Sequence, residues 1–349
     1  MSIEPIYYTH QDVFEAELEH LFAPRLYVGS DHDFADIDAY RSLKLGSTAF
    51  TLRRTSESLR AFNNVCLHRG SLIDPLGSGK RSFRCSYHGW AYDAQGKLKS
   101  TPLVENPIID CGRLEEYPVS QSSGLVFVGL SGTPPDVAKV PSAMRMVGLP
   151  ITTEQPFYKS TLLHACNWKI MVENVVEGYH LSFVHQNTFQ AAGFSSRSEY
   201  AWGGDAYTCW HQISPDMPSR RSSLLKKIAP DSTSDFRHAY IFPNLFIGSQ
   251  NSLVGFKQHM IPLSPIETLL EIELFELPAL IQLRSSVREH VRAEAAKFIA
   301  DTLLEDKPIV ELCQVGMSCT SRPIQPQEQE ARIRRFHDYY REQMAHAAR

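Results

Sequence analysis

Two short pairs of cysteine and histidine lie between residues 66 and 88. One residue separates Cys66 from His68, sixteen residues follow, and two residues separate Cys85 from His88. Thiolates and imidazoles at such spacings are metal ligands. They could close one tetrahedral zinc site, or they could bind a [2Fe–2S] cluster in which two histidines replace two cysteines on one iron. The hydroxyls of Ser86 and Tyr87 could hydrogen-bond to the cysteine sulfurs.

A second group of candidate ligands lies in the stretch 167–185, NWKIMVENVVEGYHLSFVH. Glu177 and His180 are three residues apart and would be neighbours on one face of a helix. His180 and His185 are five residues apart, which turns them roughly 140° away from each other on a regular helix. Both could bind one metal only if the helix ends or bulges between them. On these residues alone, two incidental histidines are an equally good interpretation.

Both groups resemble motifs of one family. The stretch from CLHR to CSYHGW resembles the Rieske signature of the ring-hydroxylating and related non-haem iron oxygenases. The stretch 167–185 is similar to the mononuclear iron motif of the same family, and the two motifs follow in the family's order over nearly the whole chain. The resemblance implies an α+β protein. Its N-terminal domain would be an all-β Rieske [2Fe–2S] domain, and its C-terminal catalytic domain would join an antiparallel sheet to helices in a helix-grip arrangement.

The resemblance also implies a set of ligands. The four residues of the two cysteine–histidine pairs would hold the [2Fe–2S] cluster, and His180 and His185 would bind a ferrous ion together with one late aspartate. The candidate for that aspartate is Asp306, because ED followed by E-x-x-Q resembles the family's third-ligand segment. Asp306 could instead cap a helix that begins near Lys307 and Pro308. The other candidates for the third ligand are Asp301, Glu305 and Glu311.

Glu177 occupies the position at which the family has an acidic residue between its two metal centres. That residue is often aspartate, and glutamate also occurs in the branch that acts on quaternary ammonium compounds. The resemblance gives Glu177 a catalytic role as a hydrogen-bonded link from a Rieske histidine to His180. In the family, the Rieske cluster of one subunit is paired for electron transfer with the mononuclear iron of a neighbouring subunit, so the resemblance implies a homotrimer.

The expected function is that of a terminal oxygenase (alpha) subunit, closest to the quaternary ammonium and N-demethylating branch. A flavin and iron–sulfur reductase, with or without a ferredoxin, would supply electrons from NAD(P)H. Because the chain has no GxGxxG motif, the nucleotide should bind that partner. The mononuclear Fe(II) would activate O2 and monooxygenate a small amine-bearing or specialised metabolite, by hydroxylation or oxidative N-demethylation.

Three alternatives stay open. The first is an aromatic-ring hydroxylating oxygenase. The second is a zinc-stabilised binding protein, and the third is a pure electron-transfer protein, which would need only the first half of the chain. The substrate pocket is expected between residues 200 and 246, where aromatic side chains could cage a quaternary ammonium, stack on a ring or fill the core. These side chains are Trp202, Tyr207, Trp210, Phe236, Tyr240, Phe242 and Phe246.

Composition limits the remaining classes. The chain has 349 residues, a net charge of −4 and 43% hydrophobic residues, which is typical of a globular protein and does not favour nucleic acid or an anionic membrane as a partner. The N-terminus lacks a signal-peptide pattern, and no apolar run is long enough to span a bilayer. A cytoplasmic protein is therefore expected. Of the seven cysteines, all except Cys66 and Cys85 are expected to be small buried residues.

The expected elements divide the chain into three parts: an N-terminal helix packing on the catalytic domain (1–39), the Rieske domain (40–135) and the catalytic domain (136–349). The helix should span 9–22, with Thr9 as its cap, and residues 131–150 should form the passage between domains. Alternating apolar residues predict the strands, and apolar stripes predict two further helices. The strands are expected near 49–55, 58–65, 124–130, 238–249, 252–263 and 268–277, and the helices at 284–304 and 326–345.

Overall fold

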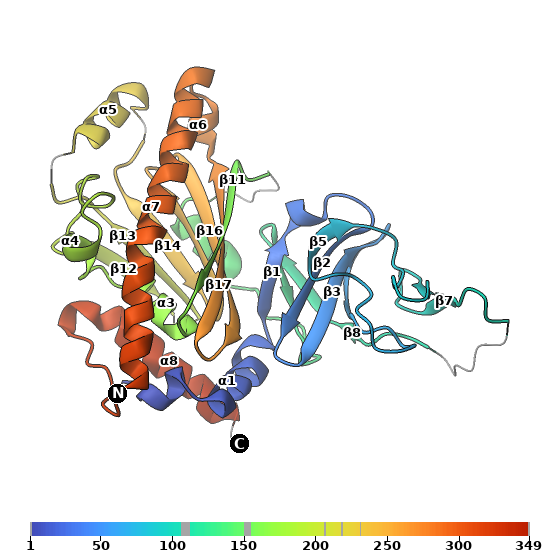
Figure 1. The fold of residues 1–349 in the computed structure, drawn as a ribbon. Coiled ribbons are helices and arrows are strands. Elements are labelled where there is room, and N and C mark those ends of the chain that lie inside the picture. The colour runs from blue at the N-terminus through green and yellow to red at the C-terminus, as the bar shows by residue number, and fades with distance from the viewer. Residues whose placement is uncertain are drawn as a thin grey trace. The chain divides into compact units, whose positions relative to one another are not determined.

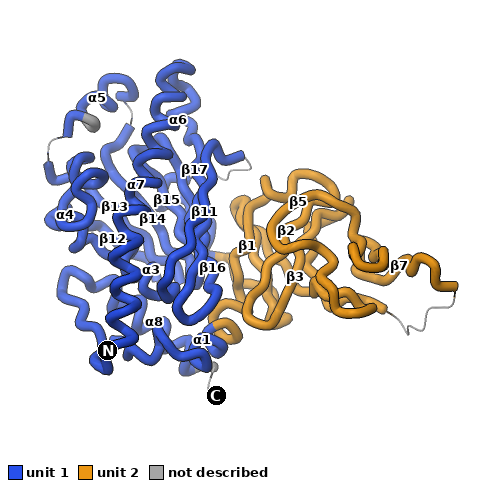
Figure 2. The backbone as a smooth tube through the Cα atoms, viewed as in Figure 1, with its two compact units in different colours: residues 1–17, 139–349 blue, residues 18–138 orange. Residues whose placement is uncertain are grey.

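The computed structural model (Figure 1) describes residues 2–105, 112–149, 155–205, 207–217, 219–230 and 232–347. Figure 2 shows two compact units, one formed by residues 18–138 and the other by residues 1–17 together with 139–349. No helix within the described ranges combines the length and the hydropathy that crossing a bilayer requires.

The unit of residues 18–138 is built from short antiparallel strands. Its largest sheet has five strands in the order β5-β2-β3-β4-β8; a three-stranded sheet has the order β1-β10-β9, and β6 pairs with β7. The strands expected near 49–55, 58–65 and 124–130 are confirmed as β3, β4 and β10. The strands are β1 (Leu26–Ser30), β2 (Ala39–Leu45), β3 (Thr48–Arg54), β4 (Leu59–Asn63), β5 (Gly77–Lys80), β6 (Ala91–Tyr92), β7 (Leu98–Ser100), β8 (Glu116–Tyr117), β9 (Val119–Ser122) and β10 (Leu125–Val128).

Two loops of this unit carry the cysteine–histidine pairs, one between β4 and β5 and the other between β5 and β6. Each pair is followed by a glycine at positive φ, +71° at Gly70 and +74° at Gly89, a conformation that side-chain-bearing residues rarely adopt. The amide of each glycine donates to the carbonyl of the cysteine four residues earlier, at 3.0 Å to Cys66 and 3.1 Å to Cys85. The two loops therefore turn in the same way and present their ligands alike.

The second unit contains a seven-stranded antiparallel sheet with the order β11-β17-β16-β15-β14-β13-β12. The strands expected at 252–263 and 268–277 are confirmed as β16 and β17, whereas the single strand expected at 238–249 is two antiparallel strands, β14 and β15. Figure 1 shows the long helix α7 running across the sheet. The expected α+β class is also confirmed. The strands are β11 (Tyr158–His164), β12 (Tyr200–Gly204), β13 (Thr208–Ile213), β14 (Phe236–Ile241), β15 (Leu245–Gln250), β16 (Val254–Ser264) and β17 (Glu267–Glu276).

The helices of this unit come from both ends of the chain. They are α1 (Gln11–Glu17), α2 (Val140–Met146), α3 (Trp168–Val176), α4 (Leu181–Val184), α5 (Arg220–Ile228), α6 (Pro278–Ile281), α7 (Ser285–Ser318) and α8 (Ala331–Ala347). The predicted helices at 284–304 and 326–345 correspond to α7 and α8. Helix α7 continues through Pro308, so Asp306 lies inside a helix and does not cap a new one. Lys307 forms an ion pair with Glu311 on the same stretch of α7.

Other expectations need correction. Thr9 closes a 3₁₀ turn, Pro5–Tyr8, and α1 begins only at Gln11; residues Leu18–Phe22 continue as a π-helix. The stretch 131–149 is not a plain passage, because α2 forms within it, and residue 150 lies outside the described residues. Cys313 and Cys319 are exposed, contrary to the expectation that they are buried, and Cys111 also lies outside the described residues.

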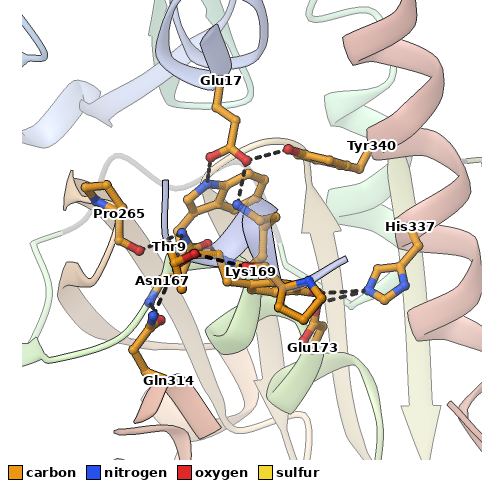
Figure 3. A network of polar contacts seen from close by, with 12 residues as sticks. Thr9, Glu17, Asn167, Lys169, Glu173, Pro265, Gln314, His337 and Tyr340 are labelled. Carbon is orange, nitrogen blue, oxygen red and sulfur yellow. Dashed lines mark hydrogen bonds and ion pairs between the residues drawn. The ribbon is translucent and has the colours of Figure 1, made fainter. Parts of the chain in front are cut away.

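A buried ion pair joins the N-terminal segment to α3 within this unit (Figure 3). Lys169 and Glu17 are both fully buried, with 2.5 Å between Nζ and Oε1. The same carboxylate accepts hydrogen bonds from Trp168 Nε1 at 2.8 Å and from the Tyr340 hydroxyl at 2.5 Å. Burial lowers the pKa of the Lys169 ammonium, and the nearby carboxylates of Glu17 and Glu173 oppose that shift. The network therefore ties α1, α3 and α8 together.

Candidate metal centres and active site

The two ligand loops bring their cysteines and histidines into one cluster with two sides. The Cys66 and Cys85 side chains are buried in the small core of the loops, whereas His68 and His88 are exposed at the surface. The two imidazole rings lie 4.5 Å apart between centroids, and His68 stacks on Trp90 at 4.6 Å. Thiols inside and imidazoles outside fit a [2Fe–2S] cluster whose inner iron takes the cysteines and whose outer iron takes the histidines.

A tyrosine that the sequence interpretation did not select contacts one of the thiols. The Tyr92 hydroxyl donates to Cys66 Sγ at 3.3 Å and accepts from the backbone amide of Leu67 at 3.0 Å. Burial raises the pKa of this hydroxyl, so it stays protonated and remains a donor. The two hydroxyls that were expected near the sulfurs accept hydrogen bonds elsewhere, Ser86 from Arg81 and Tyr87 from Arg69.

We expect Tyr92→Phe to lower the reduction potential of the cluster. A hydrogen bond to a ligating sulfur stabilises the reduced, more negative cluster, so its loss favours the oxidised state. The potential is measured by a redox titration followed by the electron paramagnetic resonance (EPR) signal of the reduced cluster. Tyr87→Phe is the control, because its hydroxyl contacts Arg69 and not a thiol. Equal potentials in the Tyr92→Phe variant and the unmodified protein would contradict this role.

The two histidines of the second motif stand at the two ends of one short helix. Helix α3 ends at Val176, and the extended backbone of Glu177 (φ −119°, ψ 175°) separates it from α4. His180 precedes α4 and His185 follows it. Helix α4 ends at Val184, so the helix ends before His185, as the spacing of the two histidines required, and their Nε2 atoms lie 3.1 Å apart.

Asp306 of α7 completes this cluster. Its Oδ1 lies 3.1 Å from His185 Nε2 and 3.7 Å from His180 Nε2, and it is buried without a hydrogen-bond partner among the described residues. Two ligand atoms that each lie about 2.2 Å from one metal ion, at right angles to each other, are about 3.1 Å apart. The distances between Asp306 Oδ1 and the two Nε2 atoms therefore fit a facial arrangement of two histidines and one carboxylate. An unpartnered buried carboxylate oxygen is costly unless a cation occupies the site.

The alternative third ligands have other partners. Asp301 pairs with Lys297, and Glu311 pairs with Lys307. Glu305 accepts from His185 Nδ1 at 2.9 Å and from the Thr188 hydroxyl at 2.6 Å. His180 Nδ1 likewise contacts the carboxylate of Glu177. Each imidazole thus has its Nδ1 held by a glutamate, which leaves both Nε2 atoms free to face a metal.

We expect Glu305→Gln to lower the affinity of the mononuclear site for Fe(II) by about 10- to 100-fold. The neutral amide is a weaker acceptor for His185 Nδ1–H, and it lowers the basicity of the opposite ring nitrogen. Affinity is measured by titrating the metal-depleted mononuclear site with Fe(II) under anaerobic conditions. Glu311→Gln serves as the matched control, because it makes the same change in the same helix away from the histidines. An unchanged affinity in Glu305→Gln would refute the positioning role.

A cavity of about 840 Å³, counting its part open to solvent, adjoins the three candidate ligands. The candidate ligands and Glu177 lie on its lining, and most of the remaining side chains are apolar. The other lining residues are His164, Met171, Asn174, Val175, Leu181, Phe189, Tyr200, Ile213, Phe236, His238, Phe256, Gln258, Met260, Leu270, Ile299, Thr302, Leu303 and Val310.

The expected pocket wall needs correction, because only Phe236 of the aromatic set is among the described lining residues. Tyr240 stacks on Phe246 at 4.6 Å and also contacts Phe336 of α8, so this end of β14 packs against a helix. Trp202 is 39% exposed at the surface. A sequence pattern marks these residues as apolar, but it does not say which part of this face of the sheet lines the cavity and which part is covered by α8. The residues placed away from the lining are Trp202, Tyr207, Trp210, Tyr240, Phe242 and Phe246.

A buried pair of histidines reaches this cavity from the sheet. His238 lines it, and its Nε2 lies 3.0 Å from Nδ1 of His211 on the neighbouring strand. His211 Nε2 in turn lies 3.3 Å from Cys209 Sγ. Burial, assisted by the charge of Arg332, lowers the pKa of His238 to about 3, and burial also lowers the pKa of His211. Both rings are therefore neutral near pH 7.

This pair should make folding sensitive to acid. An unfolded histidine has a pKa of about 6.5, so the unfolded state binds a proton that folded His238 rejects, and stability is lost as the pH falls from about 6.5 towards 3. At pH 5 the loss attributable to His238 is about 2 kcal/mol. We expect His238→Phe to reduce the acid sensitivity by that amount, measured by urea unfolding at pH 7.5 and pH 5.0. Equal acid sensitivity in both proteins would contradict a neutral buried His238.

Together, the loop cluster of two thiols and two imidazoles and the cluster of two histidines and one carboxylate define a Rieske-type non-haem iron protein. Comparison with protein families agrees: residues 25–118 match the Rieske [2Fe–2S] domain, and residues 152–346 match the ring hydroxylating alpha subunit (catalytic domain). The chain belongs to the ring-hydroxylating alpha subunit family. The resemblance stated from the motifs is confirmed, and with it the expectation of a [2Fe–2S] domain followed by an iron-binding catalytic domain.

Individual relatives come from both branches of the family. The chain is 30% identical to the carnitine monooxygenase oxygenase subunit of Escherichia coli over 197 residues, 53% of this chain and 52% of that protein. It is 28% identical to the toluate 1,2-dioxygenase subunit alpha of Pseudomonas putida over 228 residues, 57% and 50% of the two chains. These matches span about half the length of each relative. A crystal structure of a quaternary ammonium Rieske monooxygenase with L-carnitine superposes with a TM-score of 0.77 at 20% identity, covering 98% of this chain and 95% of that one.

Proposed function

We propose that this chain is the terminal oxygenase component of a Rieske oxygenase system. One observation carries the proposal: Nε2 of His180, Nε2 of His185 and the unpartnered Oδ1 of Asp306 converge on the wall of an apolar cavity. Two imidazoles and one carboxylate leave coordination positions open for dioxygen beside a substrate. The Rieske domain in the same chain supplies the means of delivering electrons.

In this proposal the residues have separate roles. The ligands of the cluster are Cys66, His68, Cys85 and His88, and those of the mononuclear site are His180, His185 and Asp306. When bound, the ferrous ion supplies the chemistry of dioxygen activation. Glu177 and Glu305 hold the Nδ1 protons of the two histidines and so orient their rings. The apolar wall of the cavity excludes water from the reacting substrate.

The electron path requires partners. We propose that a flavin and iron–sulfur reductase, with or without a ferredoxin, transfers electrons from NAD(P)H to the cluster. A further structure of the quaternary ammonium Rieske monooxygenase is described as revealing inter-subunit electron transfer. By analogy, this chain would work as a homotrimer in which Glu177 links a neighbouring subunit's cluster to His180. The contact of the Glu177 carboxylate with His180 Nδ1 supports that role.

The reaction proposed is monooxygenation, by hydroxylation or oxidative N-demethylation, of a small amine-bearing or specialised metabolite. The names of relatives that act on carnitine and glycine betaine support it. Hydroxylation of an aromatic ring is the second candidate. The name of the toluate dioxygenase relative supports that candidate, as do the rings of Phe189, Phe236 and Phe256 on the cavity wall.

The test begins with an iron count and an absorption spectrum of anaerobically purified protein before and after dithionite. We expect a red-brown protein that bleaches and holds about three irons per chain, two in the cluster and one in the mononuclear site. The reduced protein is then exposed to ¹⁸O₂ with a panel of N-methyl amines and aromatic compounds, and labelled products are sought. A zinc-loaded, colourless chain that stays colourless after cluster reconstitution would overturn the oxygenase proposal.

A further inference from the structure

Four residues that line the cavity have a buried polar atom without a hydrogen-bond partner among the described residues, namely Asp306 at the candidate iron site and His164, Tyr200 and His238. His238 is 2% exposed, lines the cavity, and its Nδ1 is buried without a hydrogen-bond partner among the described residues. Its other nitrogen, Nε2, is engaged with His211 at 3.0 Å. A buried polar group without a partner costs about 1–3 kcal/mol. A purely structural histidine would leave that cost uncompensated, whereas a bound molecule with a polar group facing Nδ1 would remove it.

The neighbouring groups explain why this nitrogen can serve as either donor or acceptor. If the Cys209 thiol donates to His211 Nε2, His211 Nδ1–H donates to His238 Nε2, and His238 Nδ1 then carries a proton. If both hydrogen bonds have the opposite direction, so that His238 Nε2–H donates to His211 Nδ1 and His211 Nε2–H donates to Cys209 Sγ, His238 Nδ1 carries no proton and is an acceptor. Both arrangements keep the two rings neutral. His238 therefore offers the cavity a neutral hydrogen-bonding position that can act as donor or acceptor in a largely apolar wall.

Charge on the cavity wall limits what can bind. Among the described residues that line it there is no lysine and no arginine, and the only carboxylates are Glu177 and Asp306. Both carboxylates face the candidate iron-binding histidines. Away from the candidate iron site, a substrate carboxylate would therefore be buried without a cation to pair with, which is strongly unfavourable. The rest of the wall consists mainly of aliphatic and aromatic side chains, which favour an apolar ligand body.

We propose that His238 is a specificity-determining residue whose Nδ1 hydrogen-bonds to the one neutral polar group of an otherwise apolar substrate. This inference rests on the proposed function and narrows its substrate class. The substrate is an aromatic or alicyclic molecule without a carboxylate, and its polar group is a carbonyl, amide, hydroxyl or unprotonated nitrogen. It is thus distinguished from the zwitterion carnitine, after which one relative is named, so within the proposed function the inference favours an aromatic compound or a neutral specialised metabolite as the substrate.

The first test compares the affinities of three probes of one shape for the unmodified holoprotein, which is reduced and kept anaerobic. 2-Naphthamide carries a neutral polar group, 2-naphthoate carries the isosteric carboxylate, and naphthalene carries neither. Dissociation constants are measured by isothermal titration calorimetry, with L-carnitine as a fourth probe. We expect 2-naphthamide to bind at least about tenfold more tightly than 2-naphthoate and L-carnitine. Tighter binding of either carboxylate would overturn the inference.

The second test removes both ring nitrogens with His238→Phe, which keeps an aromatic ring of similar size. We expect the affinity for 2-naphthamide to fall about tenfold, while the affinity for naphthalene stays within about twofold. Retained cluster absorption and an unchanged iron count establish that the variant is folded. An equal loss for both probes would mean that the ring only fills space. A loss of amide preference in His164→Phe, but not in His238→Phe, would place the anchor at the other cavity histidine.

These outcomes separate the inference from the function on which it rests. The readout is affinity, which needs no turnover and no reductase. A chain that binds 2-naphthamide through His238 but never incorporates oxygen into any substrate would contradict the proposed oxygenase function and leave the binding inference intact. A chain that incorporates oxygen into substrates and prefers 2-naphthoate would support the proposed oxygenase function and contradict the binding inference. The comparison with the unmodified protein remains decisive even if His238→Phe does not fold.

Discussion

Asp306→Asn is expected to give a red-brown protein that holds about two irons per chain in place of about three, because the cluster keeps its two irons and the mononuclear site loses its own. The amide cannot supply the negative charge that Asp306 places 3.1 Å from His185 Nε2. Losing a direct ligand should exceed the 10- to 100-fold effect typical of residues that only orient ligands, so product formation should fall by at least about 100-fold.

The control for this experiment lies in the same helix. Asp301 is also an aspartate of α7, but it pairs with Lys297 at the surface, so Asp301→Asn should keep the full iron count and nearly full activity. The dithionite-bleached absorption of the cluster, recorded for both variants, shows that the Rieske domain is intact. If Asp306→Asn kept about three irons per chain, one of the alternative carboxylates would have to be the ligand, and Glu305 would be the next to test.

Local residue spacing selected the two cysteine–histidine pairs as candidate ligands, because a metal site restricts the types and spacing of residues that are close in sequence. Spacing alone left His180 and His185 open, and the resemblance to a family added them and Asp306 as candidates. Two contacts were not predicted, that of Tyr92 with Cys66 and that of Glu305 with His185 Nδ1, because they span 26 and 120 residues of sequence. No spacing rule encodes such contacts. Only the fold brings the side chains together.

The cavity wall illustrates the same limit. The strands of the second half were predictable from alternating apolar residues, but alternation does not say where along one face of a sheet a cavity ends and a packed helix begins. In β14, Phe236, His238 and Tyr240 lie on one face, yet Phe236 and His238 line the cavity and Tyr240 contacts Phe336 of α8. Helix α8 lies about 100 residues further along the chain, so its packing could not be inferred from the strand itself.

The largest stability effect is expected from Glu17→Gln. This change leaves the fully buried Lys169 without its counter-charge, so the lysine must stay charged and unpaired or give up its proton. Either outcome should cost about 3–5 kcal/mol of unfolding free energy, the range found when one partner of a buried ion pair is removed. The amide oxygen can still accept from Trp168 and Tyr340, so the loss should come mainly from the charge. Urea unfolding followed by far-ultraviolet circular dichroism measures it.

A double variant tests this explanation directly. Glu17→Gln combined with Lys169→Met removes both charges, and it should recover much of the stability lost in Glu17→Gln, because no unpaired charge remains buried. Glu15→Gln, an exposed change in the same helix, should alter stability by less than about 0.5 kcal/mol. If the double variant were no more stable than Glu17→Gln, the shape and hydrogen bonds of the network in Figure 3 would matter more than its charge. The N-terminal segment would then be held to α3 by packing, and the buried lysine would contribute through its contacts with the rings of Tyr8, Trp168 and Tyr340.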